Sequence, residues 1–218
     1  MLSNMRNFSV IIPAFNEART IKGVIEVAKK CDYVDEIIVV DDGSSDETGT
    51  IATGAGARVI TLSPNRGKAQ AMDAGVKAAK NDYICFLDAD LKNFSIEILN
   101  NIIAPVVDGR YDMFAVIFGR SIWGINWLTP HLPIISGNRA LSKETWNLVP
   151  EKFKVKFQIE IALNYSAKRA GKKIGAISWP GFSHAIKEKK YGLWRGLYRR
   201  VKMIWDIIWI FARVRIEK

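Results

Sequence analysis

Short apolar runs rich in Val, Ile and Phe alternate with longer segments whose apolar residues recur at helical spacing. The runs predict β-strands, the longer segments predict amphipathic helices, and their alternation predicts a mostly parallel sheet. We therefore expect an α/β fold with a Rossmann-like central sheet and flanking helices. The strands are expected at 8–12, 36–40, 58–62, 83–87, 113–118 and 173–178, and the helices at 20–31, 44–54, 68–80, 95–107, 157–163 and near Trp146.

Two of the expected helices begin with a capping signal. Ser44 stands three residues before Glu47, which predicts a capping box at the start of the second helix. Ser95 is expected to cap the fourth helix.

Composition favours one folded domain in a reducing compartment. The chain has 218 residues, 49% of them hydrophobic and 25% charged, which is enough to bury one substantial core. Its two cysteines, Cys31 and Cys85, lie next to apolar segments and have no metal-type spacing, so we expect buried free thiols. The first residues show no signal-peptide pattern, and we expect a cytoplasmic location.

Positive charge is concentrated at the end of the chain. The net charge is +10, and residues 187–218 carry ten Lys or Arg against three acidic residues, a net of +7. The remaining part is only weakly basic, which argues against a nucleic-acid-binding protein. We expect two parts, a domain at 1–190 and a basic tail helix at 191–218.

Within the tail, residues 193–212 form an amphipathic helical pattern. Written on a helix, one face carries Trp194, Leu197, Tyr198, Val201, Ile204, Trp205, Ile208 and Phe211, and the other carries Arg195, Arg199, Lys202 and Asp206. The apolar stretch is far shorter than the ~20 residues of a spanning helix. The pattern predicts a peripheral helix on the anionic inner face of the membrane, with docking against the domain or a second subunit in a homodimer as the alternative.

Acidic residues follow the strand expected at 83–87. Asp88 and Asp90 are separated by Ala89, and ligands of open α/β sheets bind beyond the carboxyl ends of the strands. Carboxylates at this position are typical of a site where a divalent cation binds both the protein and the phosphates of a substrate. A solvated turn or helix cap is the simpler interpretation of such a pair considered alone.

Three other strand ends carry polar or aromatic residues. After the first strand, Phe15 is a candidate to lie against a base and Glu17 to reach a ribose hydroxyl, although a core Phe and a first-turn Glu are equally ordinary. After the second, Asp42 is a candidate to accept the imide hydrogen of a uracil-like base, or to form an Asx turn. After the third, Lys68 at a helix start is a candidate phosphate ligand or a solvated loop residue.

Residues 10–17 (VIIPAFNE), 38–46 (IVVDDGSSD) and the Asp-Ala-Asp resemble family 2 glycosyltransferases of the GT-A fold. The resemblance implies that Pro13, Ala14, Glu17 and Asp42 hold the base and ribose of a nucleotide-sugar. It also implies that Asp90 binds the cation. Within the family, the Gly-Lys element and the second half are similar to glucosyl-3-phosphoglycerate synthases and polyprenyl-phosphate sugar transferases.

The same resemblance suggests an acceptor side in the second half. Ser136 and Gly137 resemble the family's acceptor-side loop, and Gly119 and Arg120 follow the strand expected at 113–118. Arg120 is a candidate to bind an anionic acceptor, because a guanidinium matches phosphate and carboxylate geometry. An ordinary loop and an exposed arginine are the alternatives.

Two further residues complete the candidate site. Glu160 lies in an otherwise apolar helical stretch, where a carboxylate is costly unless it is paired or faces a cavity. It resembles the acidic residue that some relatives place beside the acceptor hydroxyl, and the resemblance makes it a candidate base or acceptor ligand. A solvent-facing glutamate is the alternative. By resemblance, His184 joins Asp90 as a ligand of Mn²⁺ or Mg²⁺.

Together, these features predict a metal-dependent transferase. We expect it to move a sugar from a UDP- or GDP-linked donor to a small anionic or polyprenyl-phosphate acceptor at the membrane, with Asp90 and Glu160 as catalytic residues. Stabilising the departing diphosphate would be the main catalytic task. The alternatives are a sugar nucleotidyltransferase and a non-catalytic, membrane-bound nucleotide-sugar sensor.

Overall fold

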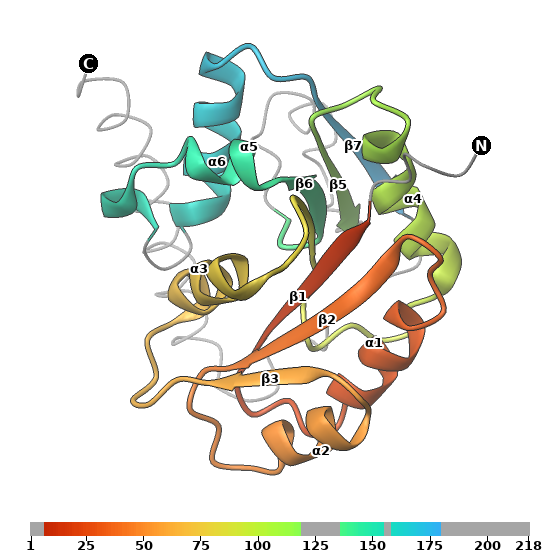
Figure 1. The fold of residues 1–218 in the computed structure, drawn as a ribbon, viewed down its shortest axis with the longest axis vertical. Helices are drawn as coiled ribbons and strands as arrows, with labels where there is room; N and C mark the ends of the chain where they lie inside the picture. Colours follow the sequence, from red (N-terminus) through yellow and green to blue (C-terminus); the bar gives the residue numbers. More distant parts are fainter. Residues whose placement is uncertain (1–6, 119–135, 155–157, 180–218) are drawn as a thin grey trace, which may run out of the picture.

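A seven-stranded sheet organises the residues that the computed structural model describes, which are 7–118, 136–154 and 158–179 (Figure 1). Its order is β3-β2-β1-β4-β6-β5-β7. The strands are β1 (Phe8–Ala14), β2 (Val34–Asp41), β3 (Arg58–Thr61), β4 (Tyr83–Phe86), β5 (Met113–Phe118), β6 (Arg139–Ser142) and β7 (Ile174–Trp179). The helices are α1 (Ile21–Ala28), α2 (Thr48–Gly54), α3 (Lys68–Ala78), α4 (Ile96–Val107), α5 (Lys143–Asn147), α6 (Gln158–Arg169) and the 3-10 turn η2 (Glu151–Phe153).

Most neighbouring strands are parallel, as the β-α-β alternation predicted. β1 pairs in parallel with β2 and β4, β2 with β3, and β5 with β7. β6 is the exception, because it pairs antiparallel with both β4 and β5. Ser136 and Gly137 were expected in a loop and do precede β6, but no strand was predicted at Arg139–Ser142. The short strand holds a buried arginine, so its sequence lacks the usual alternation of a strand.

Each face of the sheet packs against its own set of helices. Val10 and Ile12 of β1 belong to a core cluster with α1 and α4, while Ile11 belongs to a cluster with α3, α5 and α6. Figure 1 shows these helices on opposite faces. Because successive strand side chains point to opposite faces, an uninterrupted apolar strand fills both layers. Burying each such aliphatic side chain contributes about 1.5–3 kcal/mol.

The two predicted helix caps had different outcomes. Ser95 caps α4, since its side chain accepts from the Ile98 N–H at 3.4 Å. The capping box at Ser44 was wrong, because α2 begins only at Thr48 and has no side-chain cap on Glu47. The Ser44 hydroxyl instead accepts from the Asn16 N–H at 2.9 Å, so it joins the loop after β2 to the loop after β1.

The predicted thiols are buried and free. Cys31 and Cys85 lie in the core cluster of the α1 and α4 face, and burial raises the pKa of both thiols. No helix in the three described ranges is both long enough and apolar enough to cross a membrane. The predicted tail helix at 191–218 lies outside those ranges.

Candidate functional site

The loops that follow β1 and β2 are joined by hydrogen bonds at the carboxyl edge of the sheet. Asn16 adopts a left-handed backbone with φ of 57°, and its side-chain oxygen accepts from the Ser45 N–H at 2.8 Å. The Glu17 N–H donates to the Thr48 hydroxyl at 2.9 Å. Phe15, at the tip of this junction, is 48% exposed. An exposed aromatic on an anchored loop can stack against a planar ligand, and the interpretation of Phe15 as a core residue is wrong.

Pro13, Ala14 and Glu17 lie along the same edge. Pro13 and Ala14 are the last two residues of β1, and the Ala14 carbonyl accepts from the Asp42 N–H at 2.8 Å. Glu17 is half-buried and accepts from the Thr20 hydroxyl at 3.3 Å. The first two strand ends therefore bring these residues next to Asp42.

Asp42 connects that edge to the loop before α3. It is 3% exposed, and its carboxylate accepts from the N–H groups of Arg66 and Gly67, both at 2.7 Å. Gly67 has φ of +90°, a conformation that favours glycine. Each carboxylate oxygen retains a lone pair for a further donor. Asp42 thus holds the segment that leads directly into Lys68, and its role as a base ligand stays a prediction.

Lys68 is the centre of a cluster of charges. Its ammonium donates to Asp88 Oδ1 at 2.8 Å and to Glu160 Oε1 at 3.2 Å. The Lys68, Asp88 and Glu160 side chains are 29%, 18% and 8% exposed. Burial alone would lower the pKa of Lys68, but the two carboxylates outweigh it and raise this pKa above its usual value. The interpretations of Lys68 as a solvated loop residue and of Glu160 as solvent-facing are therefore wrong.

A buried turn before β6 closes the cluster from the other side. Asn138 donates from Nδ2 to Asp88 Oδ2 at 3.0 Å, and its Oδ1 accepts from the Asp88 N–H at 2.9 Å. Gly137 lies against Asp88, because a Cβ on it would fall 2.5 Å from Asp88 Oδ1. Arg139 is fully buried, and burial lowers its pKa although Glu160 and Asp88 oppose this shift. The structure thus places the acceptor-loop candidate Gly137 beside the donor-side Asp88, while Ser136 bonds to the Val116 carbonyl.

Sequence reasoning assigned no role to Asn138 or Arg139. Both directly follow Ser136 and Gly137, which resemble the family's acceptor-side loop, but their residue types alone do not indicate a role. The feature of the sequence that could have indicated them is the run of small and polar residues before an apolar pair, Ala140 and Leu141, because such a run predicts a turn followed by a strand. The antiparallel pairing of β6 could not be inferred from it.

Asp90 is the predicted ligand of a divalent cation that lies within the described residues. Ala89 is buried and Asp90 is half-buried, two residues beyond the Lys68-bound Asp88. Carboxylate oxygens suit Mn²⁺ or Mg²⁺, and these ions usually share their coordination with substrate phosphates. Within the described part of the chain, no group of three or more His, Cys, Asp and Glu is arranged to hold a metal. The predicted ligand His184 and the acceptor candidates Gly119 and Arg120 lie outside that part.

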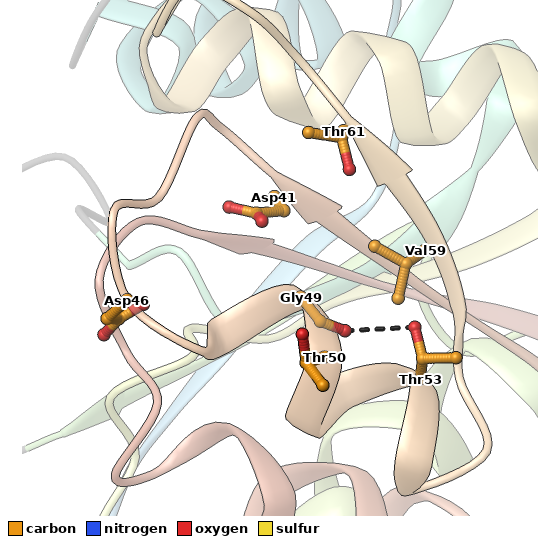
Figure 2. A pocket seen from close by; sticks show the side chains of 7 residues that line it. All are labelled: Asp41, Asp46, Gly49, Thr50, Thr53, Val59 and Thr61. Atoms are coloured by element: carbon orange, nitrogen blue, oxygen red, sulfur yellow. Dashed lines mark hydrogen bonds between the residues drawn. The ribbon is translucent and has the colours of Figure 1, made fainter.

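A separate hollow of about 390 Å³ lies between α2 and the β2–β3 edge (Figure 2). Asp41 and Asp46 line it, together with Gly49, Val59 and three threonines. Asp41 accepts from the Ser44 N–H at 3.0 Å and faces Gly49, whereas its neighbour Asp42 faces the loop before α3. The two adjacent carboxylates therefore serve different places, and the hollow is distinct from the Lys68 cluster.

A mostly parallel sheet with an antiparallel β6, and with an Asp-Ala-Asp and a lysine–carboxylate cluster beyond its strand ends, defines a GT-A-type domain. The model of Glycosyl transferase family 2 matches residues 9–171. The chain belongs to this family, which confirms the resemblance inferred from its motifs.

Relatives and solved structures agree with this assignment. A glucosyl-3-phosphoglycerate synthase of Mycobacterium tuberculosis is 36% identical over 62% of this chain and 44% of its own length. An undecaprenyl-phosphate 4-deoxy-4-formamido-L-arabinose transferase of Pectobacterium carotovorum is 36% identical over 43% of this chain and 32% of its own length. The chain thus spans less than half the length of these curated relatives.

The solved structures extend the likeness to ligand complexes. The M. tuberculosis synthase bound to Mn²⁺, uridine diphosphate and glucosyl-3-phosphoglycerate has a TM-score of 0.70 and 28% identity, over 82% of this chain and 72% of that one. The same synthase also has a structure with Mg²⁺ and uridine diphosphate.

Proposed function

We propose that the chain is a metal-dependent glycosyltransferase that transfers a sugar from a UDP- or GDP-linked donor to a small anionic or polyprenyl-phosphate acceptor. The observation that carries this proposal is the contact of one ammonium, Lys68 Nζ, with both Asp88 and Glu160. This contact joins the donor side of the sheet to helix α6. Membership of the family and the ligands bound in the similar solved structures support the same reaction.

The donor lies across the ends of β1, β2 and β4 in this proposal. Phe15 stacks on the base, Glu17 and Asp42 bind the nucleoside, and Pro13 and Ala14 shape the edge beneath it. Lys68 donates to the diphosphate and stabilises the negative charge that develops there as the bond to the anomeric carbon breaks. Asp88 and Ala89 complete the donor side.

A divalent cation completes the donor site. Asp90 and His184 would hold Mn²⁺ or Mg²⁺, which supplies charge neutralisation for the diphosphate. The match between oxygen ligands and these ions supports Asp90 as a ligand.

Glu160 acts on the acceptor side. With a hydroxyl acceptor, the carboxylate accepts the proton that leaves the oxygen as it bonds to the anomeric carbon. With a phosphate acceptor, the attacking oxygen is already ionised, and Glu160 instead orients neighbouring donors. Ser136, Gly137, Gly119 and Arg120 are the proposed acceptor contacts, Arg120 through its guanidinium.

The test is transfer of radiolabelled sugar with Mn²⁺ or Mg²⁺. UDP- and GDP-sugars are offered with 3-phosphoglycerate or a polyprenyl phosphate, and the product is separated from free sugar. We expect metal-dependent transfer that falls at least about a hundredfold in Asp90→Asn. The matched acid-to-amide control is Asp108→Asn at the end of α4, where the acid is exposed and pairs with Arg110 at 3.0 Å. We expect the control to leave the rate unchanged.

Three results would contradict the proposal. Transfer that persists in Asp90→Asn would exclude the cation role. Pyrophosphate release from a nucleoside triphosphate and a sugar phosphate would establish a nucleotidyltransferase. Tight nucleotide-sugar binding with no turnover against any acceptor would favour a sensor.

Peripheral binding to the inner face of the membrane, and hence a cytoplasmic location, is part of the proposal. Its support is the net charge of +7 on residues 187–218 and the amphipathic pattern of 193–212. Flotation with anionic liposomes, with and without residues 193–218, is the test. We expect the truncated chain to stay with the soluble fraction, and unchanged partitioning would remove this part of the proposal.

A further inference from the structure

The turn at residues 136–138 is held rigidly at both ends. The Ser136 hydroxyl donates to the Val116 carbonyl at 2.6 Å, and the Val116 N–H donates to the Asn138 carbonyl at 3.1 Å. Arg139 donates from Nε and Nη2 to the Ser136 carbonyl at 3.0 and 2.5 Å. Its Nη1 donates to Asn164 Oδ1 at 3.0 Å, which links the turn to α6. A buried guanidinium with three such bonds leaves the turn little freedom.

From this turn, the Asn138 side chain forms two hydrogen bonds with Asp88. One amide group donates to the carboxylate and also accepts from the backbone N–H of the same residue, at 3.0 and 2.9 Å. Asn138 is 1% exposed, so water does not compete for these bonds. The two contacts fix both the backbone and the side-chain torsion of Asp88.

Asp88 in turn fixes Lys68. The carboxylate uses Oδ2 for Asn138 and Oδ1 for the Lys68 ammonium at 2.8 Å. Rotation of the carboxylate would therefore break one contact to keep the other. Gly137 lies directly against the Asp88 and Lys68 side chains, because a Cβ on it would clash with both.

We propose that Asn138 is a positioning residue for the transfer reaction, acting through Asp88 to hold the Lys68 ammonium where the donor diphosphate arrives. The expected effect on sugar transfer rests on the proposed function. The positioning of Asp88 and Lys68 rests on the contacts described above. Small misplacement of a charged group costs much of its catalytic benefit, because its geometry must be set before the reaction. Asn138→Ala removes both contacts without adding bulk.

The experiment is a double-substitution cycle of Asn138→Ala and Asp88→Ala. In the wild-type background, we expect Asn138→Ala to lower both kcat/KM for the donor and the affinity for UDP about tenfold or more, while KM for the acceptor changes less than about twofold. In the Asp88→Ala background, the same substitution should lower UDP affinity, measured with Mn²⁺ by calorimetry, less than about twofold further. The melting-temperature losses should likewise be less than additive.

Asn81 provides the matched control at the other end of β4. Its half-buried side chain also makes two contacts, donating to the Ser9 hydroxyl at 3.1 Å and to Asp35 Oδ1 at 2.5 Å. Asn81→Ala should lower the melting temperature and leave kcat/KM for the donor and KM for the acceptor unchanged. This difference separates positioning from a general structural role.

The outcomes separate the inference from the proposed function. An equal loss from Asn138→Ala in both backgrounds, or a loss of kcat/KM that Asn81→Ala reproduces, would overturn the inference. If the wild-type chain transfers no sugar to any acceptor, the proposed function fails. The melting-temperature cycle then decides by itself whether Asn138 acts through Asp88, and additive losses would overturn that claim.

Discussion

Removing the Lys68 ammonium should leave Asp88 and Glu160 without the cation that lies between them. The two side chains are only 18% and 8% exposed, so water replaces the lost contacts poorly. At an effective dielectric constant of about 20, unit charges about 3 Å apart attract by about 5 kcal/mol before desolvation is subtracted. Breaking a buried ion pair by removing one partner typically costs about 3–5 kcal/mol.

Partial exposure of Lys68 reduces this cost. Its side chain is 29% exposed, and Arg139 adds a second positive charge behind the two carboxylates. We therefore expect Lys68→Met to lower the free energy of unfolding by about 2–3 kcal/mol, less than for a fully buried pair. For a domain of this size, that loss lowers the melting temperature by about 5–10 °C.

The sharper test is the coupling between Lys68 and Glu160, measured by urea unfolding of Lys68→Met, Glu160→Gln and the double variant. We expect a coupling of about 1–3 kcal/mol, since residues in direct ionic contact are not additive. The exposed pair Lys22–Glu26, at 3.8 Å and with side chains 66% and 55% exposed, is the matched control. Its cycle should give no more than about 0.5 kcal/mol.

The pH dependence of the contribution follows from the raised pKa of Lys68. A lysine with a raised folded-state pKa stabilises fully below its unfolded value of about 10.4, and the stabilisation is lost as pH rises through the folded value. The coupling should therefore persist from neutral pH to about pH 10. Additivity within about 0.5 kcal/mol for Lys68 and Glu160 at pH 7.5 would refute the reasoning.

Phe15→Ala should weaken UDP binding, measured by calorimetry with Mn²⁺, by about 1–3 kcal/mol, because a stacking contact is lost. The control is Ile177→Ala on β7, where the apolar side chain is 38% exposed, and it should leave UDP binding unchanged. Gly137→Ala should lower donor kcat/KM at least about tenfold with a stability cost of about 1–3 kcal/mol, because the new Cβ would displace Asp88; unaltered kinetics would contradict this packing. Hydrogen bonds from Lys77, Lys154 and Trp146 lower the pKa of Asp73 despite its burial, so its contribution is present above the unfolded value of about 3.9 and is lost as pH falls below it. Asp73→Asn should therefore cost about 2–4 kcal/mol at pH 7, and unfolding at pH 3 should show a smaller difference from wild type.

The sequence predicted strands and helices best where the spacing of apolar residues alone determined each element. Short, mostly apolar runs predicted β1 to β5, and the helices between them followed from their spacing. The start of α2 was misplaced because Ser44 binds the neighbouring loop through Asn16, a tertiary contact that competes with local capping. A contact with a residue 28 positions away cannot be predicted from the local sequence.

The candidate site shows the same division between local and tertiary information. The lone acid of an apolar stretch, Glu160, pointed to a paired carboxylate, and the structure supplies its partner Lys68 at 3.2 Å. Which cation would pair with it could not be predicted, because the two residues are 92 positions apart. Asn138 was missed for a related reason, since its importance comes from β6 lying beside β4.

The direction of β6 explains why its first residues belong to the site. The carboxyl ends of parallel strands meet at one edge of a sheet, where ligands bind. An antiparallel strand begins at that edge, so the residues just before it reach the same place. The register pairs Phe86 with Arg139, and continuing it sets Asn138 beside Leu87 and Gly137 beside Asp88. In this fold, residues that precede an antiparallel strand are therefore as strong candidates for the site as those that follow a parallel one.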